Sequence, residues 1–289
     1  MFSRLSPKQH RIVFNKDGHF VVRACPGSGK TLTVAARLAY RMQVWSLKHQ
    51  GIAALSFTNV AWEEIKKKLE NDFYTTCRYP HFLGTIDSFI NQYIFLPFGH
   101  LFMNCVSRPV LVGEPHGHWS GPPFYEQYFD KVSLDISGFL IKTAPIQSVP
   151  VPLIKNGLET KHVTNLIKMK QKYWGKGFTT QDDANYIAMK LLEKYPDIAR
   201  AIGFRFPEFI IDEAQDTSEI QMKIIDLLLE KEIKQIMIVG DPDQAIFEWR
   251  QANPKLFEDK YNVWENNSEV LNENWRSSQL ICNCSHPLS

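Results

Sequence analysis

Ala24-Cys25-Pro26-Gly27-Ser28-Gly29-Lys30-Thr31 is the stretch of this sequence that decides its fold. It follows an apolar run, His19–Cys25, and precedes a helical pattern, Leu32–Trp45. Gly27 and Gly29 can take backbone angles that other residues resist, which lets successive amide N–H groups face phosphate oxygens. The start of the following helix adds partial positive charge. The stretch therefore predicts a phosphate-binding loop between a strand and a helix.

The same stretch matches the Walker-A loop of proteins that bind nucleoside triphosphates, in the strand-to-helix context that this loop requires. We expect all of Ala24–Thr31 to contact ATP, with Lys30 reaching the β- and γ-phosphates and Thr31 ligating Mg²⁺. The general pattern has Gly at the position of Ala24, and a small residue there is neutral. The loop alone does not separate kinases, transporters and helicases.

Outward from the loop, short apolar runs alternate with helical patterns. Near-continuous apolar runs are typical of parallel strands buried on both faces. The predicted strands are His19–Cys25, Ile52–Thr58, His81–Ile86, Glu208–Asp212 and Gln235–Asp241. The predicted helices are Leu32–Trp45, Val60–Asn71, Asp87–Ile94 and Glu219–Lys231. The alternation predicts an α/β fold with a doubly wound parallel sheet.

The middle of the chain interrupts this alternation. Pro- and Gly-rich pieces and then mainly helical patterns fill residues 95–205, and the strand–helix rhythm resumes at Phe206. We expect residues 1–94 and 206–289 to form the sheet domain and residues 95–205 to form an inserted helical subdomain.

Bulk composition limits the classes of partner and compartment. The formal net charge is only +2, so any surface for nucleic acid must be a local patch. The amino-terminal residues lack the apolar core of a signal peptide, and the longest apolar stretch, residues 92–112, is interrupted too often to span a membrane. We therefore expect a cytosolic protein without membrane contact.

The cysteines and histidines give little support for a disulfide framework or a metal site. Five cysteines at irregular spacing predict free thiols. The pattern formed by Cys282, Cys284 and His286, and that of His116 and His118, each supply too few ligands for a familiar metal site.

A second chemical feature is the apolar run that ends in Asp212-Glu213-Ala214-Gln215-Asp216. A carboxylate at the end of that strand can hold Mg²⁺ opposite the phosphate loop, and Asp212 is the predicted ligand. Glu213 can accept a proton from the attacking water or orient it. The alternative is a strand that ends in a solvated acidic turn.

With these acids, the sequence resembles superfamily-1 DNA helicases of the UvrD/Rep/PcrA type. Motifs similar to those of the family occur in its order over nearly the whole chain, which is identified on this basis as the first RecA-like half of such a motor. They are Leu5–Gln9, Ala24–Thr31, Ser56–Asn59, Gly84–Phe89 with Asp87 where His is usual, Asp212–Ser218, Val239–Arg250 and Asn274–Ser278 with Trp275 in place of Tyr.

The resemblance implies roles for particular residues in nucleotide binding. Gln9 reads the edge of adenine, Trp275 stacks on adenine, and Gln244 senses the γ-phosphate. Arg276 acts as an arginine finger, which raises turnover by roughly 10³–10⁵ in comparable enzymes; the alternative is an ordinary surface arginine. Leu32 stands where the family often has Arg, which removes one phosphate contact.

The resemblance also implies contacts with single-stranded DNA. The predicted contacts are Phe57, Thr58, Asn59, Thr85, Phe247, Trp249 and Arg250. An aromatic ring on which a base stacks contributes roughly 1–3 kcal/mol. Packing in the core is the alternative for Phe247 and Trp249. The segment Lys168–Lys176 combines basic and aromatic residues, which predicts either a DNA-binding surface or a solvated helix face. Lys66–Lys68 predicts a solvated helix face.

The resemblance implies an ATP hydrolase that translocates 3′ to 5′ on single-stranded DNA, at a duplex junction. Because the family's later motifs are expected downstream of Arg276, we expect this chain to lack the second RecA-like half and not to unwind DNA unaided. It is then a fragment, a truncated product or one part of a two-chain machine in which a second protein supplies that half. The alternatives are an ATP-switched DNA-binding subunit of a nuclease, repair or defence complex, and a small-molecule kinase or ATPase, which has no evident use for the aromatic segment 244–250.

Overall fold

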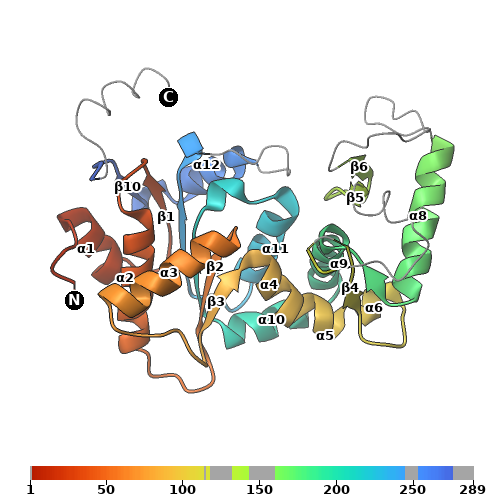
Figure 1. The fold of residues 1–289 in the computed structure, drawn as a ribbon, viewed down its shortest axis with the longest axis horizontal. Coiled ribbons are helices and arrows are strands. Elements are labelled where there is room, and N and C mark those ends of the chain that lie inside the picture. Colours follow the sequence, from red (N-terminus) through yellow and green to blue (C-terminus); the bar gives the residue numbers. More distant parts are fainter. Residues whose placement is uncertain (1, 114, 118–131, 143–159, 245–252, 276–289) are drawn as a thin grey trace.

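The computed structural model describes residues 2–113, 115–117, 132–142, 160–244 and 253–275. Its centre is a six-stranded sheet in the order β10-β1-β9-β8-β2-β3, and all neighbouring strands are parallel (Figure 1). The strands are β1 (His19–Ala24), β2 (Ile52–Ser56), β3 (Phe82–Thr85), β8 (Glu208–Ile211), β9 (Gln235–Gly240) and β10 (Glu269–Leu271). The five predicted strands are confirmed, and β10 is a sixth that the sequence pattern did not predict.

Helices cover both faces of the sheet, as the apolar strands require. On one face lie α1 (Pro7–Phe14), α2 (Lys30–Gln43) and α3 (Asn59–Asp72). On the other lie α4 (Ile86–Ile90), α9 (Gln181–Lys194), α10 (Pro196–Arg205), α11 (Glu219–Leu229) and α12 (Pro254–Val263). Successive residues of β1 alternate between the two cores: Phe20 and Val22 pack on the first, and Val21 on the second. The predicted α/β class with a doubly wound parallel sheet is confirmed.

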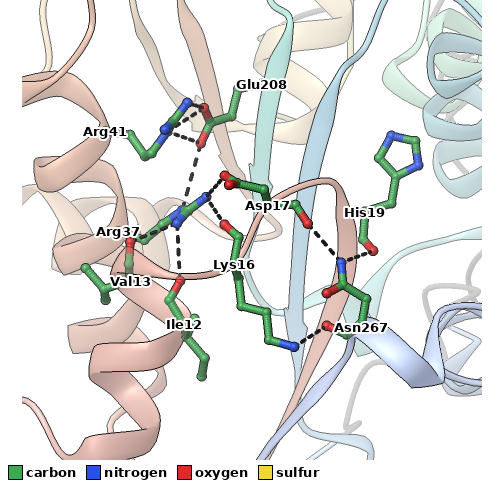
Figure 2. A network of polar contacts seen from close by, with 9 residues as sticks. All are labelled: Ile12, Val13, Lys16, Asp17, His19, Arg37, Arg41, Glu208 and Asn267. Carbon is green, nitrogen blue, oxygen red and sulfur yellow. Dashed lines mark hydrogen bonds and ion pairs between the residues drawn. The ribbon is translucent and has the colours of Figure 1, made fainter.

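A buried arginine forms hydrogen bonds between α1 and α2, the helix that follows the phosphate loop (Figure 2). Arg37 of α2 is 1% exposed and donates hydrogen bonds to the carbonyl oxygens of Ile12, Val13 and Lys16 at 3.3, 2.8 and 2.8 Å. One turn later, Arg41 forms a forked pair with Glu208 at the start of β8. Burial raises the pKa of Glu208, and Arg41 opposes that rise. Together these contacts fix α1, α2 and β8 relative to one another.

The middle of the chain builds a smaller unit beside the sheet (Figure 1). Its described elements are the π-helix Asn91–Phe95, α5 (Leu96–Phe98), α6 (His100–Met103), β4 (Val110–Leu111), β5 (Val132–Leu134), β6 (Leu140–Lys142), α8 (Thr160–Gly175) and β7 (Phe178–Thr179). The unit has its own apolar core, to which α9 contributes Ala184 and Ile187, while Ala188 and Met189 of α9 join the core of the sheet. Because α9 serves both cores, the boundaries at 94/95 and 205/206 stay a prediction.

The basic segment on α8 divides between two faces of that helix. Lys170 and Trp174 are buried, and Lys170 Nζ lies 2.7 Å from Asp183 Oδ2 of α9. Lys168, Lys172 and Lys176 are exposed. One lysine and the tryptophan of the predicted DNA grip are therefore structural, because their side chains attach α8 to α9.

No group of three or more potential ligands for a metal ion occurs within the described part of the chain. His116 Nε2 lies 2.7 Å from Gln181 Oε1, while His118, Cys282, Cys284 and His286 lie outside the described residues. Cys25, Cys77 and Cys105 are free thiols. Over the same described residues, none of the helices has the length and apolar character that crossing a membrane takes.

Candidate functional site

The residues predicted to hold the phosphates and Mg²⁺ gather at the carboxyl ends of three adjacent strands, β1, β9 and β8. The phosphate loop follows β1, Asp241 and Gln244 follow β9, and Asp212 follows β8. Ligands of open α/β sheets bind outside the carboxyl ends of the strands. The parallel topology thus places these segments on the edge of the sheet where such ligands bind.

The phosphate loop has the backbone that its glycines predict. Gly27 and Gly29 have φ angles of 75° and 82°, in the left-handed region, and Gly29 is the N-cap of α2. The Ser28 side chain is 2% exposed, and its Oγ has no hydrogen-bond partner within the described residues. A buried hydroxyl without a partner in this loop is available to a phosphate oxygen.

Lys30 at the start of α2 has three side chains around its ammonium group. Its Nζ lies 3.0 Å from Gln244 Oε1, 3.3 Å from Asp241 Oδ2 and 3.7 Å from Glu213 Oε2. Burial raises the pKa of Asp241, and the positive charge of Lys30 counteracts it. The structure therefore brings the predicted Lys30, Glu213 and Gln244 together. Asp241 is a neighbour that the sequence pattern did not predict, although it lies within the recognised segment Val239–Arg250.

Asp212 has the environment of a cation ligand. Its side chain is 1% exposed, and Oδ1 is buried without a hydrogen-bond partner within the part of the chain that the structure describes. Burial raises the pKa of Asp212, and the adjacent charge of Glu213 raises it further. A carboxylate oxygen is a preferred ligand of Mg²⁺, which would satisfy this buried atom. Thr31, the predicted second ligand, is the second residue of α2 and half-buried.

Glu213, the predicted general base, has an unusual backbone and a fixed carboxylate. Its φ of 53° is in the left-handed region, which costs a residue other than glycine about 1–3 kcal/mol and is common at functional sites. Gln215 Nε2 donates to Glu213 Oε2 at 2.7 Å, and Gln215 Oε1 accepts from the backbone N–H of Asp241 at 3.0 Å. Gln215 therefore links the turn after β8 to the turn after β9.

Gln9 and Trp275, the two predicted adenine contacts, both lie against the phosphate loop. Gln9 Nε2 donates to the carbonyl oxygen of Ser28 at 3.2 Å, and Gln9 Oε1 accepts from the Ser6 N–H in the capping box of α1. The backbone N–H of Trp275 donates to the carbonyl oxygen of Gly27 at 2.9 Å, and its side chain is 68% exposed. Arg276 lies outside the described residues.

The described residues predicted to contact DNA lie at the ends of the adjacent strands β2 and β3. Thr58 caps α3 and Thr85 caps α4, each through a side-chain oxygen that accepts a backbone N–H. Phe57 is half-buried and Asn59 is exposed. Two helix N-termini thus begin side by side, each with partial positive charge. Phe247, Trp249 and Arg250 lie outside the described residues.

Comparison with known proteins agrees with the motifs. The sequence profile of the UvrD/REP helicase N-terminal domain matches residues 5–104 and 142–264. DNA helicase II of Haemophilus influenzae is 27% identical to this chain over an alignment 303 residues long with its gaps. The alignment covers 98% of this chain and 40% of that protein. The ATP-dependent DNA helicase PcrA of Staphylococcus aureus is 24% identical over 99% of this chain and 40% of its own length.

A second kind of relative matches a shorter part. The exonuclease/helicase subunit RexA of Streptococcus pneumoniae is 33% identical over 104 residues, 34% of this chain and 8% of that protein. This chain thus spans about 40% of the length of the helicases that match it nearly throughout.

Proposed function

This chain belongs to the UvrD/REP helicase N-terminal domain family, and we propose that it is the nucleotide-binding motor domain of an ATP-dependent DNA helicase. In this proposal it binds Mg-ATP, hydrolyses it, and couples hydrolysis to binding of single-stranded DNA. The observation that carries the proposal is the grouping of Glu213, Asp241 and Gln244 around the ammonium group of Lys30.

The residues present fit a magnesium nucleotide. Amide N–H groups of the loop, the Ser28 hydroxyl and Lys30 would hold the phosphates, and Asp212 and Thr31 would hold Mg²⁺. The ion supplies charge neutralisation for the phosphates when it is bound. Glu213 would hold the proton of the attacking water, in an orientation that its bond to Gln215 maintains. Gln9, Trp275 and Arg276 would contact adenine and the transferred phosphate.

Binding of the DNA strand in this proposal uses the segments after β2 and β3. Thr58 and Thr85 cap two helix N-termini, whose partial positive charge favours phosphate oxygens. Phe57, Asn59, Phe247, Trp249 and Arg250 would complete the contacts. Because no motif reads base edges, binding would be independent of sequence and sensitive to salt. The 3′-to-5′ direction rests on the resemblance alone.

A second candidate function has one observation in its favour. Relatives named as parts of a helicase/nuclease or an exonuclease/helicase match between 34% and 57% of this chain. The chain would then be an ATP-switched DNA-binding protein that acts with a nuclease or with a partner that supplies a second RecA-like half. Nucleotide binding without turnover would favour this candidate over the motor.

Two substitutions test the assignment of the nucleotide site. Lys30→Ala should weaken binding of a fluorescent ATP analogue, because it removes the charge that meets the phosphates. Glu213→Gln should leave nucleotide binding in place and lower phosphate release by about 10²–10⁴-fold, the usual contribution of a general base. Glu193→Gln, on the outer face of α9, is the matched control and should change neither. Turnover by Glu213→Gln at the unaltered rate would contradict the role given to Glu213.

A further inference from the structure

Asp87 joins three segments that are far apart in the sequence. It is the second residue of α4, and its Oδ1 accepts hydrogen bonds from Asn185 Nδ2 of α9 at 2.9 Å and from Gln221 Nε2 of α11 at 2.8 Å. Thr85, the N-cap of α4, is one of the proposed contacts with the DNA strand. One carboxylate oxygen therefore connects the strand-contact segment to two other helices.

From Gln221 the hydrogen bonds continue to the acidic turn. The Ser218 N–H donates to Gln221 Oε1 at 3.1 Å, and the Gln221 N–H donates to Ser218 Oγ at 3.3 Å, which forms the capping box of α11. Ser218 ends the segment 212–218 that contains Glu213. A shift of Asp87 would therefore act on the cap that fixes the end of this turn.

From Asn185 the hydrogen bonds continue into the inserted unit. Gln181 Nε2 donates to Asn185 Oδ1 at 3.2 Å, and Asn91 Nδ2 donates to Gln181 Oε1 at 2.8 Å. The same Gln181 oxygen lies 2.7 Å from His116 Nε2. Asn91, Gln181 and Asn185 are all buried, so their amides must keep these mutual partners. The inserted unit is thus connected to Asp87 through a fixed set of hydrogen bonds.

We infer that Asp87 is a positioning residue that couples the strand-contact segment and the inserted unit to the acidic turn, so that DNA and nucleotide change each other's affinity. This inference rests on the proposed function. Aspartate suits the position because one carboxylate oxygen accepts both amide donors at once. Histidine, usual here in the family motif, has at most one acceptor nitrogen when neutral.

The coupling can be measured as a ratio of two dissociation constants. Fluorescence anisotropy of a labelled oligothymidylate gives the affinity with and without a non-hydrolysable ATP analogue and Mg²⁺. Couplings of this kind typically reach about 5–150-fold. Asp87→Ala should bring the ratio to about one, while Asp87→Asn should keep it, because the remaining oxygen accepts both donors. A role in stability alone would lower the melting temperature and leave the ratio unchanged.

Two further variants keep the test decisive. Asn185→Ala removes the bond from α9 to Asp87 together with the bond that Asn185 accepts from Gln181. It should also reduce the ratio, which covers the case in which Asp87→Ala does not fold. Glu193→Ala, on the same helix and outside the network, should keep it. The inference would be overturned if the ratio were the same in the unaltered chain, in Asp87→Ala and in Asn185→Ala. It would also be overturned if the ratio in the unaltered chain were one. Absence of ATP turnover in a chain that retains the ratio would instead overturn only the proposed hydrolysis.

Discussion

At the scale of single residues, the centre of the candidate site is an ammonium group paired with carboxylates. The Lys30 ammonium group has the carboxylates of Asp241 and Glu213 and the amide oxygen of Gln244 within 3.7 Å. Phosphate oxygens would compete with these groups for the same donor. The acids therefore keep a buried cation paired.

Gly29 is a residue of the phosphate loop at which a side chain would strain the backbone. Its φ is 82°, and a Cβ atom there would lie 2.6 Å from Gln9 Nε2. Gly29→Ala should lower the free energy of unfolding by about 1–3 kcal/mol and weaken ATP binding. Urea denaturation and nucleotide titration measure the two effects. Gly175→Ala, where a Cβ would meet nothing within 4 Å, is the control and should change stability by less than about 1 kcal/mol.

His81 should make the fold sensitive to mild acid. Burial, and then the charge of Arg205, lower its pKa from 6.5 to about 4, and its Nδ1 accepts the N–H of Ile52. Between these pH values the unfolded chain binds a proton that the folded chain does not. The contribution of neutral His81 to the free energy of unfolding is therefore present above pH 6.5, and it is lost as the pH falls towards 4.

His81→Asn keeps an acceptor near the Ile52 N–H and cannot titrate. Urea denaturation at neutral pH and near pH 4.5 should show the unaltered chain losing on the order of 1–2 kcal/mol more than the variant. If the two proteins lost equal free energy of unfolding between these pH values, His81 would not change its proton binding when the chain unfolds in this range.

At the scale of elements, one buried ion pair holds the inserted unit together. Lys170 Nζ lies 2.9 and 2.7 Å from the two oxygens of Asp183, Trp174 Nε1 donates to the same carboxylate, and both charged side chains are 1% exposed. Asp183→Ala would leave a buried ammonium group without this partner. It should destabilise the protein by about 3–5 kcal/mol in thermal unfolding.

The double variant Lys170→Met with Asp183→Leu should recover much of that loss, because apolar side chains of similar size replace a buried pair at little cost. Lys190→Ala removes a pair on the surface of α9 and should cost less than about 1 kcal/mol. A loss in Asp183→Ala as small as that in Lys190→Ala would contradict the structural role of the pair.

At the scale of the whole molecule, the parts of the fold that depend on local pattern could be predicted. The strands β1, β2, β8 and β9 are buried on both faces, so their sequences are nearly continuous in apolar residues. Strand β10 could not be predicted, because its three residues include only one that is buried. Its place in the sheet comes from pairing with β1, a contact remote in sequence.

The same distinction applies to the candidate site. The phosphate loop and the acids after β8 could be read from the sequence because each is a local motif. The contact of Asp241 with Lys30 and the burial of Lys170 could not, because each depends on a partner from another element. The roles given to all of these residues, and those given to Gln9, Trp275, Phe57 and Asn59, stay predictions.

Steady-state phosphate release by the 289-residue chain, with and without single-stranded DNA, distinguishes a motor domain coupled to DNA from an ATPase that ignores it. A motor domain coupled to DNA should show magnesium-dependent turnover that rises when DNA is added, with oligonucleotides of unrelated sequence equally effective. Turnover at the same rate with and without DNA would contradict the proposed function, because ATP hydrolysis would then not depend on binding of the DNA strand.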